Sequence, residues 1–389
     1  MHLEIYIICA YAIVYQNVDN RSKINRMREY MNVEFRIPYL GVMVDMAGCP
    51  NYCRHCWLGT HKNGSIDIDE FRSIAEEFKS WRDEKALGIK EIGFFSWWRE
   101  PDYRYDYQEL WQLEQELSSP GRAQRFELLS TWRLARDKNY AKWAATLSPQ
   151  ACQISFFGMK ENTDWGMRRK GAFYDQLLAT ERCLDAGIAP RWQLFITKRC
   201  VHELNDFLKL VYDLKIHRRC EEIGRKFEIF IGSITPEGSG YKIENIRLEE
   251  SGLNEIPDEL ISISREGTKL LGLPESILLE EFTKSDTPAN IGVNQPILAV
   301  NADYDVYPNL AEPTEWWRLG NLKTDGINAI MNAFLNETSP GMKANRTIPI
   351  SALAKQYGNP ESRKLYTRSD LICRFMHQWG EDHIKQTSK

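Results

Sequence analysis

The sequence contains no apolar run long enough to cross a membrane as a helix. Its most apolar stretch, residues 3–15, is interrupted by Glu4 and is shorter than the roughly 18–20 residues that a transmembrane helix requires. The stretch also lacks the basic start and the small-residue cleavage site of a secretory signal. We therefore predict a soluble cytoplasmic protein with no membrane partner. Residues 1–34 are interpreted as an N-terminal extension, with a buried strand as the alternative for the apolar stretch.

The chain also lacks an excess of positive charge. Its 389 residues include 50 Lys and Arg against 54 Asp and Glu, which gives a net charge of −4. Dedicated nucleic-acid binders are usually basic, so no nucleic-acid partner is expected. The apolar and charged fractions, 43% and 27%, are those of a globular protein and exclude global disorder. The length predicts two domains, or one large barrel with an appended module.

Cysteine is too sparse and too unevenly placed for a disulfide framework. There are nine cysteines, an odd number, and three of them fall within eight residues. Small secreted domains carry a denser and more regular set. Bunched thiols in an intracellular protein indicate metal ligands instead.

Alternating strand and helix patterns run from about residue 35 to residue 232. The predicted strands are 37–44, 91–95, 126–130, 153–157, 191–195 and 227–231. The predicted helices between them are 68–84, 107–117, 141–147, 173–186 and 203–214. This alternation predicts an α/β fold with a parallel sheet and right-handed crossovers, either open or closed.

The alternation of strand and helix patterns ends after residue 232. We therefore predict a domain boundary near residue 240, which divides the chain into a first domain of residues 35–240 and a C-terminal module of residues 241–389. Residues 296–300 and 305–307 predict a small hairpin, and residues 327–335 predict a helix. The last 45 or so residues show no clear pattern.

The sharpest chemical feature is the triplet Cys49-Pro50-Asn51-Tyr52-Cys53-Arg54-His55-Cys56, which follows the first predicted strand. Three thiolates so close together on one loop can hold three irons of a cubane iron–sulfur cluster and leave the fourth iron open for another ligand. The alternative is structural zinc bound by the three cysteines and His61. In parallel α/β folds ligands gather at the carboxyl ends of the strands, where this loop lies.

The triplet resembles the C-x3-C-x-aromatic-C motif of the radical S-adenosylmethionine (SAM) superfamily, with His55 in the position of the aromatic ring. The resemblance implies a partial (β/α)6 TIM-type barrel and one 4Fe-4S cluster, held by the three cysteines. It also implies that SAM is bound at the open iron and is cleaved with an electron from a flavodoxin- or ferredoxin-type donor.

Two later segments extend the resemblance. Glu100-Pro101 matches the end of the family's Gly-Gly-Glu-Pro motif, although Trp98 and Arg99 replace both glycines. The segment around Ser155 matches the family stretch that contacts the SAM ribose, and an arginine after it pairs with the SAM carboxylate. The residues that the resemblance places at the SAM site are His55, Trp98, Arg99, Glu100, Ser130, Ser155, and Arg168 or Arg169.

The C-terminal part resembles the SPASM/twitch subgroup, but in a degenerate form. Pro236-Glu237-Gly238 takes the place of the subgroup's post-barrel loop, and Asn309 follows Tyr307-Pro308 where the subgroup has a cysteine ligand of an auxiliary cluster. Only Cys373 follows, so a single cluster and a small α+β module are expected. The missing second cluster favours a redox-neutral outcome, for which Cys373 and Cys200 are candidate hydrogen-atom donors.

Aromatic and basic residues gather near the predicted strand ends. They predict a walled cavity and an anionic substrate, and they are Trp57, Trp97, Trp98, Trp132, Trp192, Arg99, Arg133 and Arg191. The resulting hypothesis is a radical SAM enzyme that abstracts a hydrogen from a peptide or small-metabolite substrate. The alternatives are a zinc-stabilised, non-catalytic binding module and a catalytically inactive radical SAM scaffold.

Overall fold

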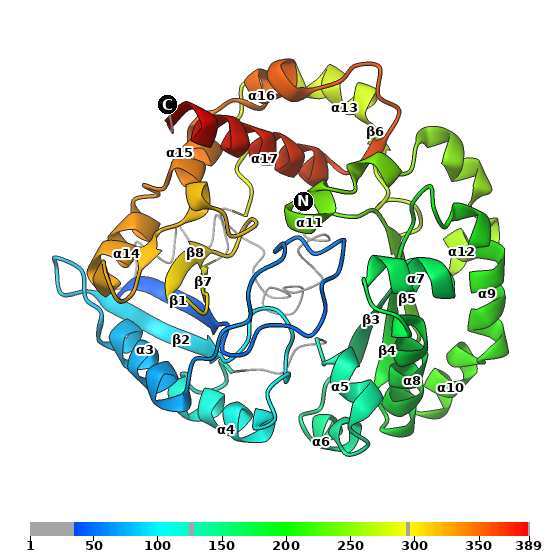
Figure 1. Cartoon of the computed structure of the whole chain (residues 1–389), viewed down its shortest axis with the longest axis horizontal. Coiled ribbons are helices and arrows are strands. Elements are labelled where there is room, and N and C mark those ends of the chain that lie inside the picture. The colour runs from blue at the N-terminus through cyan, green and yellow to red at the C-terminus, as the bar shows by residue number, and fades with distance from the viewer. Residues whose placement is uncertain (1–34, 124–127, 293–295, 388–389) are drawn as a thin grey trace, which may run out of the picture.

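The structure is a computed structural model that describes residues 35–123, 128–292 and 296–387. The predicted N-terminal extension, residues 1–34, lies outside the described residues. Figure 1 shows two groups of strands with helices on their outer sides and loops between them.

The first sheet begins with β1 (Phe35–Val44), which pairs in parallel with β2 (Gly88–Phe95). Residues 40–46 are all buried, as expected for a strand that is covered on both faces. The connecting helix α3 (Ile68–Ser80) begins with a capping box, in which the Asp67 side chain accepts a hydrogen bond from the backbone N–H of Glu70. Helix α4 (Tyr107–Leu117) follows β2.

The second sheet consists of β3 (Ala151–Phe156), β4 (Ala189–Phe195) and β5 (Glu228–Gly232), all parallel. Its helices α8 (Ala172–Asp185), α9 (Leu204–Asp213) and α10 (Ile216–Glu222) lie on the outer side (Figure 1). Five of the predicted strands are thereby confirmed. The predicted strand 126–130 lies partly outside the described residues. Its described part forms no strand, because Ser130 is the N-cap of α5 (Thr131–Arg136).

The predicted C-terminal hairpin is confirmed, and it joins the first sheet. Strand β7 (Ile297–Val300) pairs in parallel with β1, from Gly41–Ile297 to Val44–Val300. Strands β8 (Asp305–Pro308) and β9 (Gly320–Asn321) complete the order β2-β1-β7-β8-β9. The C-terminal residues therefore share a hydrophobic core with β1 and β2. The boundary near residue 240 stays a prediction.

The expectation that the last 45 residues lack a pattern is wrong. They include α16 (Ile350–Tyr357) and the long α17 (Arg368–Thr387), and α15 (Pro340–Thr347) comes directly before them. Leu371, Ile372, Phe375 and Met376 are buried at helical spacing on α17. Figure 1 shows α17 crossing the upper part of the view, from the side of α15 toward α11.

The other helices and strands are short and connect these parts. They are α6 (Tyr140–Thr146), α7 (Lys160–Gly166), α11 (Gly238–Tyr241), α12 (Asp258–Ile263), β6 (Leu273–Pro274), α13 (Glu275–Phe282), α14 (Gly326–Leu335) and β10 (Leu365–Tyr366).

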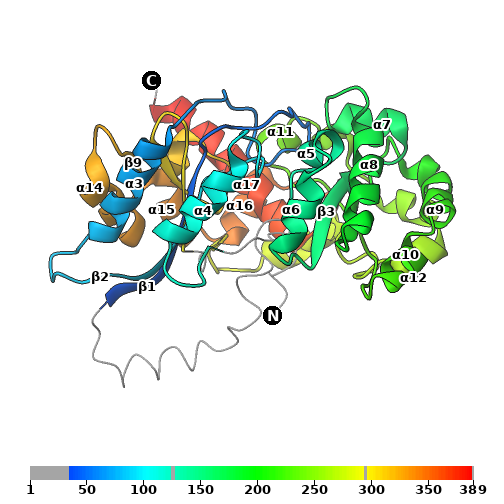
Figure 2. The same ribbon diagram turned by 90° about the horizontal axis from the view of Figure 1, so that it is seen from below.

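The architecture is mixed α/β, with one mixed and one parallel sheet in the arrangement of a partial barrel, and the described strands do not close into a ring. Figure 2 shows α3 and α14 at one end of the molecule and α9 and α10 at the other. Among the described residues, no helix combines the length and the apolar character that a membrane span needs.

Candidate active site

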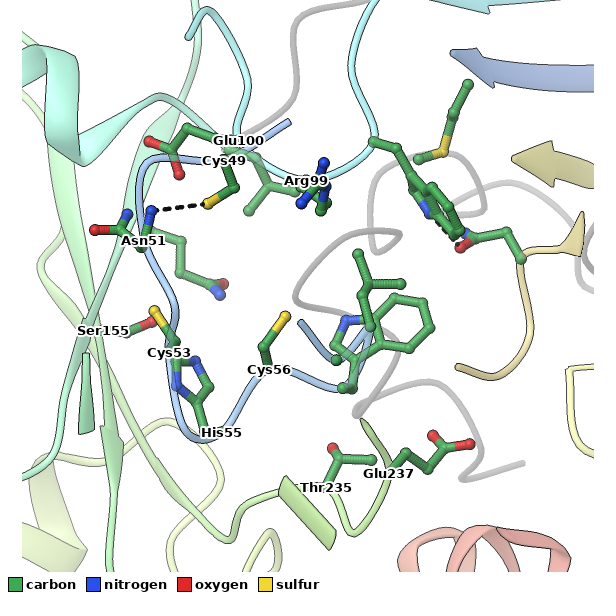
Figure 3. Close-up of a pocket in the computed structure, with 18 of the residues that line it drawn as sticks. Cys49, Asn51, Cys53, His55, Cys56, Arg99, Glu100, Ser155, Thr235 and Glu237 are labelled. Carbon is green, nitrogen blue, oxygen red and sulfur yellow. Dashed lines mark hydrogen bonds between the residues drawn. The ribbon is translucent and has the colours of Figure 1, made fainter. Parts of the chain in front are cut away.

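A cavity of about 370 Å³ lies between the two sheets. It is lined by residues of β1 to β4, by the loops after β1, β2 and β5, and by the start of α17. Its volume is within the ~300–1,000 Å³ range of pockets that take small molecules. Figure 3 shows the cysteine loop curving around this space.

All three cysteines of the triplet line the cavity and are half-buried. None forms a disulfide, and the thiol of Cys53 contacts the sulfur of Met167 at 3.7 Å. The backbone N–H of Asn51 donates to the Cys49 sulfur at 3.4 Å (Figure 3). Burial raises the pKa of all three thiols, so the loop holds them protonated until a positively charged centre stabilises the thiolates. This donor set, on one loop and open to one cavity, fits an iron–sulfur cluster.

His55 lies between two rings of the second sheet. Its ring centroid is 4.6 Å from that of Phe157 and 4.9 Å from that of Phe195. Burial lowers its pKa to about 4, so the imidazole is neutral at physiological pH. His55 lines the cavity, and its buried Nδ1 has no hydrogen-bond partner.

The structure does not bring together the ligands that the zinc alternative requires, which are the three cysteines and His61. The His61 ring nitrogen Nε2 contacts the carbonyl oxygen of Leu58. Among the described residues, no three His, Cys, Asp or Glu side chains are grouped closely enough to hold a single metal ion.

Arg99, which replaces a glycine of the family motif, anchors the cysteine loop. Its Nε donates to Asp45 at 2.7 Å, and its other nitrogens donate to the carbonyls of His61 at 3.0 Å and Lys62 at 3.3 Å. The side chains of Asp45 and Arg99 are only 4% and 7% exposed. The pair therefore fixes both ends of the loop segment that carries the cysteines.

Trp98, which replaces the other glycine, connects the first sheet to the C-terminal hairpin. Its indole Nε1 donates to Asn309 Oδ1 at 3.2 Å, and its ring stacks on Tyr307 with the centroids 6.2 Å apart. Both Trp98 and Asn309 line the cavity. The bulky ring thus occupies a place next to the residue that stands where the subgroup has a cysteine.

Glu100 lines the cavity beside Cys49 (Figure 3). Burial raises its pKa to about 7, opposed by a hydrogen bond of 2.5 Å that the Ser130 hydroxyl donates. Ser130 itself is fully buried, is not part of the cavity lining and accepts a hydrogen bond from the backbone N–H of Arg133 as the cap of α5. Ser130 therefore acts on the site through Glu100.

The remaining predicted SAM-site residues differ in placement. Ser155 lines the cavity near Cys53 (Figure 3). Arg168 is exposed, whereas Arg169 is half-buried and its Nε donates to Asn51 of the cysteine loop at 3.0 Å. Arg169 is therefore the arginine that faces the cysteine loop.

The loop after β5 packs directly on the cysteine loop. The backbone N–H of Ser239 donates to the Cys56 carbonyl at 2.9 Å, and that of Gly238 donates to the Glu312 carboxylate. Gly238 has a φ of +55°, and a Cβ built there would lie 2.4 Å from the Trp57 carbonyl oxygen. Only glycine allows this approach.

Glu237, Asp370 and Ser233 line the cavity, and sequence reasoning assigned them no role. Their burial raises the pKa of Asp370 to about 6 and that of Glu237 well above its usual range. For Glu237 and Ser233, the sequence feature that could have indicated a role in the site is their position in the loop after a parallel strand. The sequence gives no comparable indication for Asp370, because the helix that carries it was not predicted.

The two candidate hydrogen donors lie in different places. Cys373 lines the cavity, and burial together with the nearby Glu237 carboxyl group raises the pKa of its thiol. Cys200 is fully buried, is not part of the lining, and its thiol donates to the Phe195 carbonyl at 3.4 Å.

The predicted rim of aromatic and basic residues is only partly correct. Trp57, Trp97 and Trp98 line the cavity, but Trp132 and Trp192 do not, because Trp192 is in the core of the second sheet. The three arginines on which the expectation of an anionic substrate rests all have partners within the protein, so they do not support it. Arg99 is paired with Asp45, Arg191 is paired with Glu228, and Arg133 donates to the carbonyls of residues 102–104.

The chain is similar to known proteins both in part of its sequence and in its fold. Residues 43–210 match the model of the Radical SAM superfamily. No curated protein sequence matches the chain. Among solved structures, native anSMEcpe with bound AdoMet is 13% identical, with 90% of this chain and 99% of that chain covered at a TM-score of 0.50, and shares the fold.

Two further solved structures are similar at lower scores. SuiB of Streptococcus suis bound to S-adenosylmethionine is 13% identical, with coverages of 90% of this chain and 80% of that chain and a TM-score of 0.45. The coproporphyrinogen III oxidase HemN of Escherichia coli, a radical SAM enzyme, is 11% identical, with coverages of 96% and 97% and a TM-score of 0.39.

Proposed function

We propose, on the premise that residues 43–210 form a radical SAM domain, that the protein is an enzyme that cleaves SAM reductively and abstracts a hydrogen atom from its substrate. When bound, a 4Fe-4S cluster and SAM supply the 5′-deoxyadenosyl radical that starts this chemistry. The observation that carries the proposal is that the three cysteines of one loop open on the same cavity as Glu100, in the loop after β2 of the first sheet, and Ser155, in β3 of the second.

The roles of the residues follow from their placement. Cys49, Cys53 and Cys56 hold the cluster at the wall of the cavity. Glu100, positioned by Ser130, accepts hydrogen bonds from the SAM amino group, and Ser155 contacts the ribose. Arg169 rather than Arg168 pairs with the SAM carboxylate, because Arg169 contacts the cysteine loop through Nε, and its ion pair with Asp175 is made through Nη1. A guanidinium suits a carboxylate through two parallel hydrogen bonds.

The substrate is a peptide or a small metabolite, and the electron donor is of the flavodoxin or ferredoxin type. The proposed outcome is redox-neutral, with Cys373 as the hydrogen-atom donor. Its S–H bond breaks as a C–H bond forms on the substrate radical, and the resulting thiyl is reduced by an electron from the same donor type and a proton. Glu237 lines the same cavity and has a raised pKa, so we assign it as the group that supplies that proton.

Cys53→Ala is expected to lose the cluster and all SAM cleavage, because it removes one of three ligands. The measurement is iron and sulfide content after anaerobic reconstitution, followed by chromatographic detection of 5′-deoxyadenosine with dithionite and SAM. Cys220→Ala is the matched control, since Cys220 is buried on α10, away from the cavity. Zinc without iron would favour the non-catalytic module. Iron without 5′-deoxyadenosine would favour an inactive scaffold.

Cys373→Ala is expected to keep its iron and its SAM cleavage but to change the product. With a substrate turned over in D2O, the wild-type product should carry solvent deuterium from the exchanged thiol, and the variant product should not. Cys200→Ala, at a thiol outside the cavity lining, should label like wild type. Equal deuterium incorporation in the Cys373 variant would remove this residue from the mechanism.

A further inference from the structure

We propose that Glu237 and Asp370, here called the acidic wall, bind a protonated amine of the substrate. This inference names a substrate class for the site and rests on the proposed function for the identity of the reaction. Both carboxyl groups line the cavity, and they are contributed by the loop after β5 and by α17. Figure 3 shows Glu237 on the opposite side of the cavity from Glu100 and Cys49.

The acidic wall has hydrogen-bonding capacity that the protein does not use. Asp370 is 1% exposed, and its Oδ2 has no hydrogen-bond partner. The hydroxyl oxygen of Ser233, a fully buried residue that also lines the cavity, has none either. Buried polar atoms are normally paired, so free acceptors at a cavity surface point to a ligand that donates hydrogen bonds. An ammonium group has three donors and no acceptor.

The charges around the acidic wall are not balanced. Asp370 forms an ion pair with Arg247 at 3.6 Å, but Arg247 is shared with Glu244 at 2.9 Å, and its hydrogen bonds go to Glu244 and to the carbonyls of Ile234 and Leu365. Among the described residues, no ion pair includes Glu237, and the neighbouring Glu312 adds a further negative charge. His377 is directed at Glu312 and not at the cavity.

This imbalance selects for a cation. Carboxylates buried side by side repel each other and lose hydration, and an opposite charge between them offsets both effects. An anionic ligand would increase the repulsion between the carboxylates, and a neutral ligand would leave that repulsion unchanged. Cys373 lines the same cavity as Glu237 and Asp370, so an amine held by the acidic wall shares the cavity with the proposed hydrogen-atom donor.

The test compares two probes that differ only in charge, hexylamine and 1-hexanol, on the reconstituted holoenzyme with SAM. Binding is measured by calorimetry at pH 7.5 under anaerobic conditions. Since a charge-assisted hydrogen bond contributes ~1.5–3 kcal/mol, hexylamine is expected to bind at least about tenfold more tightly than 1-hexanol. The double variant Glu237→Gln/Asp370→Asn should lose this preference. Glu280→Gln, an exposed change on α13 that also removes one negative charge, should retain it.

Each outcome decides the question. Equal affinity of the two probes, or no measurable binding of hexylamine, would overturn the proposal without relying on any variant. Preference retained in the double variant would place the amine elsewhere and overturn it too. Circular dichroism and iron content check that the variants are folded. Because 5′-deoxyadenosine formation is measured separately, its absence would contradict the proposed function and leave the amine result to be judged by itself.

Discussion

Gly238→Ala should leave a protein with little bound iron and greatly reduced stability. A Cβ at this position would lie 2.4 Å from the Trp57 carbonyl oxygen, 2.5 Å from the Gly59 nitrogen and 2.8 Å from the Cys56 carbonyl oxygen. All three are backbone atoms, so no side-chain rotation relieves the clash, and the loop that carries the cysteines must move. We expect a loss of roughly 2–4 kcal/mol in the free energy of unfolding, measured by urea denaturation, together with loss of most iron after reconstitution.

Gly187→Ala is the control that separates the effect of the steric clash from the effect of the left-handed backbone conformation. Gly187 has a φ of +78°, but a Cβ there meets no atom within 4 Å. This control should cost about 1 kcal/mol from the left-handed conformation alone and should bind iron normally. If both variants lost iron to the same extent, the close approach of Gly238 to the cysteine loop would not be the reason.

Arg99→Met is expected to destabilise the protein by ~3–5 kcal/mol, because it leaves the buried Asp45 carboxylate without its partner. The three hydrogen bonds that hold residues 45, 61 and 62 together are lost at the same time, so iron binding should fall as well. The measurements are urea denaturation and iron content. The double variant Asp45→Asn/Arg99→Met should recover part of the lost stability, since it removes the unpaired charge.

Arg218→Met provides the comparison for an exposed pair. Arg218 donates to Glu222 at 2.9 Å, but the side chains are 74% and 56% exposed. Its loss should change the free energy of unfolding by no more than ~0.5 kcal/mol. A similar small effect at Arg99 would mean that this arginine does not anchor the loop.

Local sequence patterns are sufficient to predict the parts of the fold that repeat strand and helix. The residues of β1 to β5 are mostly apolar, with isolated polar residues, and helices such as α3 and α9 have one apolar face. The close spacing of three cysteines directly after a strand likewise predicts their shared place at one cavity. These features depend on neighbours within a few residues.

The rest depends on contacts between distant segments. The Asp45–Arg99 pair and the packing of Gly238 on Cys56 and Trp57 involve residues that no local pattern connects. The same holds for the parallel pairing of β7 with β1. Arginines near strand ends predict an anionic substrate only if they are free, and their ion pairs and backbone contacts appear only in three dimensions.

The hydrogen bond between Trp98 and Asn309 joins positions that are 211 residues apart. At each of them the sequence departs from the pattern it resembles, with a tryptophan in place of glycine and an asparagine in place of cysteine. The contact couples the two positions, because the indole N–H at 98 depends on residue 309 for its acceptor. An attempt to engineer a second metal centre by restoring cysteine at 309 alone would strip the buried indole of its acceptor. Successful reversion has to begin at position 98.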